Sequence, residues 1–116
     1  MDVDKLNINS LKSEFSKYRK DLLHLNEYMY KNPELGYQEV NSVDKITKLI
    51  KKHVLDTKYK KFSNIPTAFT ASINKKSGKK NIAICIEYDA LPNVGHACGH
   101  NLISSIGLGA FFILSN

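Results

Sequence analysis

The sequence predicts an α/β domain in the order helix, helix, strand, strand, helix. Two segments in the first half of the chain repeat apolar residues at helical spacing, and residues 67–73 alternate as in a strand. The last segment is apolar on all sides, which is typical of a buried helix. Helices and strands mixed in this way favour an α/β architecture. The 116 residues give room for about one domain.

The first predicted helix starts from a cap at Asn9 or Ser10 and runs to about Lys31. Asn32 ends it, because a residue that precedes proline avoids the helical region. The second helix covers residues 38–53. Its final turn carries the basic side chains of residues 51–53, which suit the negative end of the helix dipole. His24 and His53 lie on these helices and are expected to be ordinary surface histidines. The apolar stripe of the first helix comprises Leu11, Phe15, Tyr18, Leu22, Leu25 and Met29.

The strand predictions follow from the change of period after Asp56. Phe69, Ala71 and Ile73 lie on one side of a half-buried strand over residues 67–73. Residues 75–80 form a polar turn. The continuous apolar run that follows, within residues 81–86, predicts a central strand buried on both faces, in which Cys85 is inert packing.

The last predicted helix covers residues 101–114, where Gly107 and Gly109 permit close packing. A helix that is apolar all round must be buried on every side. Two amphipathic helices and two or three strands offer little material to surround it, so we expect a larger, incomplete fold. On this expectation the chain by itself aggregates, because apolar side chains stay in water.

The charge distribution argues against nucleic acid as a partner. Residues 1–80 hold all 17 lysines and arginines and nine of the eleven acids, whereas residues 81–116 hold only Glu87 and Asp89. The basic excess is therefore a solvated face without the interleaved aromatics of a nucleic-acid binder. No apolar run reaches the ~18–20 residues of a membrane span. Two cysteines and no signal-like start favour a reducing compartment, the cytoplasm.

The candidate chemistry lies in residues 87–100, directly after the predicted central strand. Ligands of open α/β sheets bind at such strand ends. Cys98 and His100 are two residues apart in a glycine-containing loop, so both side chains can face one ion. Thiolate and imidazole suit a zinc-like ion. Asp89 can accept a hydrogen bond from a ligand histidine and fix its tautomer.

Two other interpretations of these residues stay open. Cys98 could be a nucleophile, with His96 or His100 as base and Asp89 or Glu87 orienting that base. Catalytic Cys and His residues usually come from distant parts of a chain, however, so the close spacing favours a metal. The same residues could also be plain packing, although burying two histidines and a cysteine in this loop without partners is costly.

Three motifs together resemble one known family. They are residues 32–39 (NPELGYQE), 87–92 (EYDALP) and 95–101 (GHACGHN). In this order they resemble the metal-dependent amidohydrolase and aminoacylase family, the M-twenty peptidases, in the branch of N-acyl-amino-acid hydrolases, aminobenzoyl-glutamate hydrolases and dipeptidases. The match runs from about residue 10 to the end. Glu87 and Asn101 stand where many members have Asp, which bears on the substrate more than on the chemistry.

The resemblance implies a zinc-peptidase-like α/β catalytic domain with two divalent ions (zinc, manganese or cobalt) per complete site. Cys98 and His100 match the metal-binding Cys and His of the family, and Asp89 matches a supporting acid near the site. The implied reaction is hydrolysis of linear amide bonds in N-acyl amino acids or small dipeptide-like amides.

Members of this family are several hundred residues long. Residues 1–116 would therefore be an N-terminal fragment of the catalytic domain. By the resemblance, the general-base glutamate, the other ligands and the lid and dimerisation domain lie outside it. Full-length members are expected to form homodimers, and this fragment is not. The rival hypothesis is a truncated remnant without activity.

Overall fold

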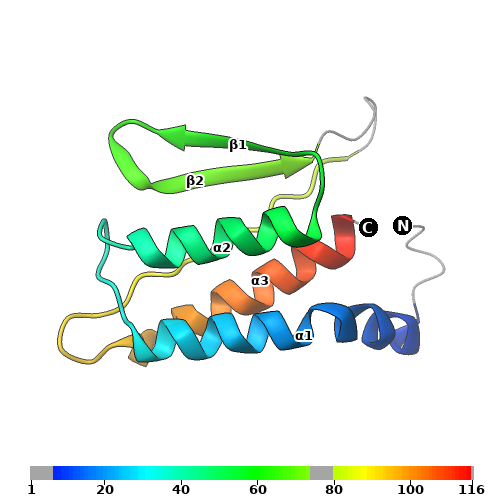
Figure 1. Ribbon diagram of the computed structural model, residues 1–116, viewed down its shortest axis with the longest axis horizontal. Helices are drawn as coiled ribbons and strands as arrows, with labels where there is room; N and C mark the ends of the chain where they lie inside the picture. Colours follow the sequence, from blue (N-terminus) through cyan, green and yellow to red (C-terminus); the bar gives the residue numbers. More distant parts are fainter. Residues whose placement is uncertain (1–6, 74–79, 116) are drawn as a thin grey trace.

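The structure is a computed structural model that describes residues 7–73 and 80–115. Its element order is α1 (Ile8–Lys31), α2 (Val40–His53), β1 (Thr57–Phe62), β2 (Ile65–Ile73), the short 3-10 helix η2 (His96–Cys98) and α3 (His100–Ser115). Figure 1 shows α3 lying along α1, with α2 between this pair and the β1–β2 hairpin. The described residues thus form a small α/β unit, which confirms the predicted class at that level.

The helices agree with the predicted ones except at their ends. The cap of α1 is Asn7, whose side-chain oxygen accepts a hydrogen bond from the Ser10 backbone N–H at 2.8 Å. The predicted cap at Asn9 or Ser10 is therefore wrong, because the first turn already contains both residues. Helix α2 begins at Val40 instead of residue 38, and α3 begins at His100.

The strands differ more from the prediction. β1 and β2 pair antiparallel, from Thr57 opposite Ile73 to Lys61 opposite Phe69, and the register shifts after Lys61. The strand predicted over residues 67–73 lies within β2. β1 was not predicted, since lysines separate its few apolar side chains. The predicted polar turn falls mainly on residues 74–79, which lie outside the described residues.

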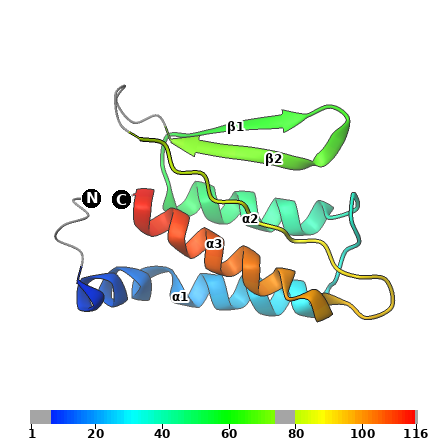
Figure 2. The same ribbon diagram turned by 180° about the vertical axis from the view of Figure 1, so that it is seen from behind.

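The predicted central strand over residues 81–86 is wrong. This stretch is extended, but within the described residues it pairs with no strand. Figure 2 shows it as the yellow trace between the hairpin and α3. Ile84 and Ile86 are half-buried, Ile82 is 73% exposed, and Cys85 is exposed rather than packed. A continuous apolar run is buried on both faces only where neighbours cover both, and here one face lies against α3.

The core joins the three helices. Its largest fully buried apolar side chains are Met29 of α1, Ile46 of α2 and Phe112 of α3. The predicted stripe of α1 is buried from Tyr18 onward, whereas Phe15, nearer the start, is 39% exposed. Figures 1 and 2 show the start of α1 extending past the other elements, so it has fewer neighbours there.

Polar side-chain contacts join α1 to α2. Asp21 Oδ2 lies 2.7 Å from both Lys52 Nζ and His53 Nε2. The hydrogen bond from Lys52 lowers the pKa of Asp21, burial opposes this, and the hydrogen bond with His53 lowers it further. The His53 ring also lies 5.1 Å from those of Tyr18 and Phe112. His53 is thus a packed residue and its prediction as a surface histidine is wrong, whereas His24 is exposed.

Glu34 caps α2 from outside the helix. Its carboxylate accepts hydrogen bonds from the backbone N–H of Asn41 at 2.9 Å and of Ser42 at 2.7 Å, and from the Ser42 hydroxyl at 2.7 Å. These groups are the unsatisfied donors of a helix start. Burial raises the pKa of Glu34, but the hydrogen bonds from Ser42 and Asn41 outweigh it, so the pKa is lowered overall. This glutamate of the first motif therefore has a structural task.

The contact between α3 and residues 82–88 depends on Gly107. A Cβ atom at this position would lie 2.2 Å from Ile86 Cγ2, far inside the contact distance. Nearby, the Ser104 hydroxyl donates to the Glu87 carbonyl at 2.6 Å and fixes the same stretch. The described part of the chain contains no helix long and apolar enough to cross a membrane.

Replacing Gly107 with alanine tests this close approach. Overpacking costs about 1–3 kcal/mol, and the 2.2 Å distance to Ile86 Cγ2 argues for the upper part of this range. Alanine gains roughly 1 kcal/mol in a helix, so the net loss of unfolding free energy should be up to about 2 kcal/mol. Urea unfolding measures it. The double variant Gly107→Ala, Ile86→Ala should cost less than the two single variants added together. Gly107→Ala with wild-type or higher stability would contradict the contact.

Replacing Glu34 with glutamine tests the cap. We expect a loss of about 1 kcal/mol in unfolding free energy at pH 7. Because the folded-state pKa is lowered, the charged cap stabilises the fold above the solvated pKa of about 4.3 and this contribution is lost as the pH falls through the folded value. The difference between the two proteins, from urea unfolding, should therefore shrink toward pH 3. Glu27→Gln, at an exposed ion pair with Lys31, is the control and should change little.

Candidate functional site

The first motif holds the second one in place. The Ala90 N–H donates to the Glu34 carbonyl at 2.7 Å, and Leu35 and Ala90 form a parallel bridge. A Cβ atom on Gly36 would be only 3.8 Å from Asp89 Oδ2, so this loop passes close beside the Asp89 carboxylate. The backbone around Asp89 is thereby positioned by residues more than 50 positions earlier in the sequence.

A tight turn then brings the third motif back to Asp89. The Leu91 N–H donates to the Gly95 carbonyl at 2.9 Å, and Asn93 within this turn has φ 67°. Gly95 and Gly99, with φ 60° and 79°, flank η2 in a backbone conformation that favours glycine. The Gly99 N–H closes η2 on the His96 carbonyl at 2.9 Å. Helix α3 begins directly after Gly99, at His100, so the first turn of the helix holds the His100 backbone.

The His100 ring is held by Asp89. Its Nδ1 lies 2.7 Å from Asp89 Oδ1 and 2.9 Å from the Asp89 carbonyl oxygen. Both of these atoms are acceptors, so Nδ1 carries the proton and donates it. The other nitrogen, Nε2, lies 3.3 Å from Glu87 Oε2. The structure thus brings together Asp89 and His100, two of the residues that the sequence singled out.

The Cys98 side chain contacts the same Asp89 carbonyl oxygen as the His100 ring does. Its Sγ is 3.8 Å from the Asp89 carbonyl oxygen, a long contact, and the side chain is half-buried. The hydrogen bonds of the described residues include none between Cys98 and either His96 or His100. A nucleophile needs such a bond to its base, so the cysteine-nucleophile arrangement is not formed here.

His96 is the buried histidine of the loop. It is 6% exposed, and neither Nδ1 nor Nε2 has a hydrogen-bond partner within the described residues. Burial lowers the pKa of His96, the neighbouring His100 lowers it further, and Asp89 acts in the opposite direction. The ring is therefore held neutral. The sequence named His96 only as a base for the cysteine alternative, and nothing in the pattern shows which of the two histidines is buried.

Two further polar side chains near the site were not assigned from the sequence. Tyr88 donates its hydroxyl proton to the Thr67 carbonyl oxygen, and its ring stacks on Phe69. Burial raises the pKa of Tyr88 to about 12, and the charges of Glu39 and Asp89 add to this. Glu39 is 8% exposed, and its Oε2 has no partner within the described residues. Both residues belong to a motif, but the groups that Tyr88 contacts come from another element, β2.

The donors fit part of a metal site. The Cys98 thiol and the His100 imidazole are of the types that zinc prefers, and Asp89 orients the histidine as ligand-supporting carboxylates do. Across residues 7–73 and 80–115, no three His, Cys, Asp or Glu side chains converge closely enough to hold an ion. The chain therefore offers an incomplete donor set.

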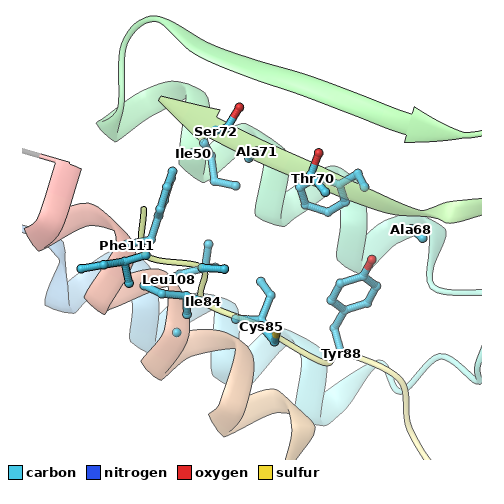
Figure 3. A pocket seen from close by; sticks show the side chains of 15 residues that line it. Ile50, Ala68, Thr70, Ala71, Ser72, Ile84, Cys85, Tyr88, Leu108 and Phe111 are labelled. Carbon is cyan, nitrogen blue, oxygen red and sulfur yellow. The ribbon is translucent and has the colours of Figure 1, made fainter. Parts of the chain in front are cut away.

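A separate cavity of about 560 Å³ lies between β2, residues 82–88 and α3. Figure 3 shows Ile84, Leu108 and Phe111 on one side of it, with Tyr88 near one end. The lining is mainly apolar but includes Thr70, Ser72 and Tyr88, and the donors Cys98 and His100 are not part of it. The candidate chemistry lies outside this cavity.

Comparisons with known proteins agree with the three motifs. The chain is 33% identical over 93 residues to a mouse Xaa-Arg dipeptidase and 30% identical over 96 residues to the human one, with 74% of the chain aligned in each case. It is 30% identical over 105 residues, 78% of the chain, to an N-acetyldiaminopimelate deacetylase of Oenococcus oeni.

The chain spans 22% of the length of the dipeptidases and 28% of that of the deacetylase. No protein-family model matches it. The relatives nevertheless align over about three quarters of the chain and include both a dipeptidase and deacetylases. On this ground the chain belongs to the M-twenty family of amidohydrolases and peptidases.

Proposed function

We propose that this chain supplies part of the active site of a metal-dependent hydrolase of linear amide bonds, acting on N-acyl amino acids or small dipeptide-like amides. The names of the relatives support the reaction, because a dipeptidase and an N-acetyl deacetylase both cleave an amide bond next to an amino acid. We assign residues 1–116, by resemblance, to the N-terminal part of a zinc-peptidase-like catalytic domain.

The observation that carries the proposal is the bond between Asp89 and His100. It directs the Nδ1 side of the ring to the carboxylate and turns Nε2 away from it. Cys98 and His100 would hold a divalent ion (zinc, manganese or cobalt), and a complete site would hold two. Such ions supply an acidified water and polarise the amide carbonyl.

The residues of this chain have defined tasks in that site. Asp89 accepts the Nδ1 proton, fixes the plane of the imidazole and raises its basicity as a ligand. The bond from Ala90 to the Glu34 carbonyl holds Asp89 in register. His96 stays neutral and so adds no positive charge that would oppose a cation. The general base and the remaining ligands are assigned, by the family resemblance, to residues outside 1–116.

Two other functions compete with this one. A cysteine-nucleophile hydrolase would need a bond between Cys98 and a histidine, and the described residues form none. A remnant without activity would retain the metal donors but would not turn over substrate. Metal binding and amide hydrolysis must therefore be measured separately.

Zinc binding tests the proposed donors. In isothermal titration of the chain with zinc chloride, we expect Cys98→Ser and His100→Ala each to lower the affinity at least about tenfold, since each removes a ligand. His24→Ala, on the exposed face of α1, is the matched control and should bind as the wild type does. Equal binding by Cys98→Ser and wild type would remove Cys98 from the site.

Hydrolysis of acetylated amino acids and of dipeptides ending in arginine separates the three functions. The proposed hydrolase loses its activity with a chelator and regains it with zinc, manganese or cobalt. Activity that survives the chelator but not thiol alkylation would indicate the cysteine nucleophile. Zinc binding without any turnover, in a protein that also carries the general base and the remaining ligands, would support the remnant.

A further inference from the structure

We propose that the cavity between β2 and residues 82–86 is a groove that receives one extended strand of polypeptide, with apolar side chains at every second position. The strand pairs with β2 along one edge and with residues 82–86 along the other, which is recognition by β-strand addition. This inference goes beyond the proposed function. It does not depend on a metal, because the donors Cys98 and His100 lie outside the cavity.

Both walls of the groove are extended backbone with an unpaired edge. Within the part of the chain that the structure describes, β2 pairs with β1 alone, so its second edge has no partner strand. Residues 82–86 are extended too, and their backbone groups form no hydrogen bond with the backbone of residues 7–73 or 80–115. Rows of unpaired N–H and C=O groups are a template for another strand. The cavity therefore has such a row on each of two sides.

The base of the groove is apolar. Ile50 of α2 and Leu108 and Phe111 of α3 line the cavity of about 560 Å³ from the helices. Figure 3 shows Leu108 and Phe111 near Ile84, on the opposite side from β2. Apolar side chains of an inserted strand would be removed from water against these residues, and this burial favours binding. No charged side chain of the described residues lines the cavity, so it does not suit an ionic ligand.

The two walls also define which side chains the strand carries. On β2, Phe69 and Ala71 are half-buried against the core, whereas Thr70 between them is exposed. On the other wall, Ile84 is half-buried and Cys85 is exposed. Both walls thus alternate between the helix side and the open side with the period of a strand. A strand between them follows the same alternation, with apolar side chains toward the helices and small or polar ones on the open side.

A polypeptide from outside residues 1–116 fits this groove better than the other candidates. A small apolar molecule would fill the base and leave the backbone groups of both walls without partners. The extended apolar segment that a second copy could insert is residues 82–86, which already forms a wall of its own groove. Proteins of this family hold further polypeptide that can supply a strand, since the chain spans only 22% of the length of the dipeptidases.

A synthetic peptide of about seven residues that alternates valine and threonine, flanked by lysines for solubility, is the probe. Isothermal titration of the full chain measures its binding. Two matched control peptides are N-methylated, one at the valines and the other at the threonines. Successive N–H groups of a strand point to opposite edges, so each control cannot pair along one edge. We expect both controls to bind at least about tenfold more weakly, because an inserted strand needs both edges.

Alkylation by iodoacetamide locates the bound peptide. Cys85 is exposed and lines the cavity, whereas Cys98 lies outside it, so the two thiols serve as probe and internal control. We expect saturating peptide to slow the alkylation of Cys85 and to leave the rate at Cys98 unchanged. Mass spectrometry of the digested protein measures both rates in one sample.

Each other outcome overturns the inference. No binding of the unmethylated peptide means that the groove does not accept a strand. Equal binding of all three peptides indicates apolar contact without strand pairing, and weakening by one methylated peptide alone indicates addition to a single edge. Binding without protection of Cys85 places the peptide elsewhere. Protection of Cys85 that rises with protein concentration in the absence of peptide would show that a second copy occupies the groove. Zinc binding is measured without the peptide, so the proposed function is tested independently.

Discussion

The close approach of residues 82–88 to α3 determines where the polar groups of the site meet. It is possible because Gly107 has no side chain at the point where Ile86 crosses the helix. Ser104, one turn earlier on α3, holds the Glu87 carbonyl. Glu87 and Asp89 are thereby carried past the first turn of the same helix, where His100 stands. Helix α3 thus packs against the extended segment and also carries His100.

The segment before the site is fixed at its other end by the first motif. Glu34 uses its side chain to cap α2 and its carbonyl to receive the Ala90 N–H. The same residue therefore links the start of a helix to the backbone beside Asp89. This link explains why the first motif lies beside the site, and why Glu34 is bonded to the start of α2 instead of facing the candidate ligands.

The sequence predicted the helices well, because a helix is written in a local pattern. The spacing of Leu22, Leu25 and Met29 defines a buried face without reference to the rest of the fold. The strand expected at residues 81–86 failed for the opposite reason, since burial on both faces depends on neighbours that the pattern does not contain. The relation of Asp89 to His100 was foreseen from residue types. The burial of His96 and the cap by Glu34 were not, because their surroundings come from distant segments.

The extended stretch over residues 82–86 has a consequence for dynamics. Its backbone N–H groups donate to no carbonyl within the described residues, so they lack the protection that strand pairing gives against hydrogen exchange. The Glu87 carboxylate stands at the end of this weakly protected stretch, whereas the His100 side chain stands on a helix. Local opening of the chain is therefore expected to begin in this stretch, while the helix that carries His100 stays formed.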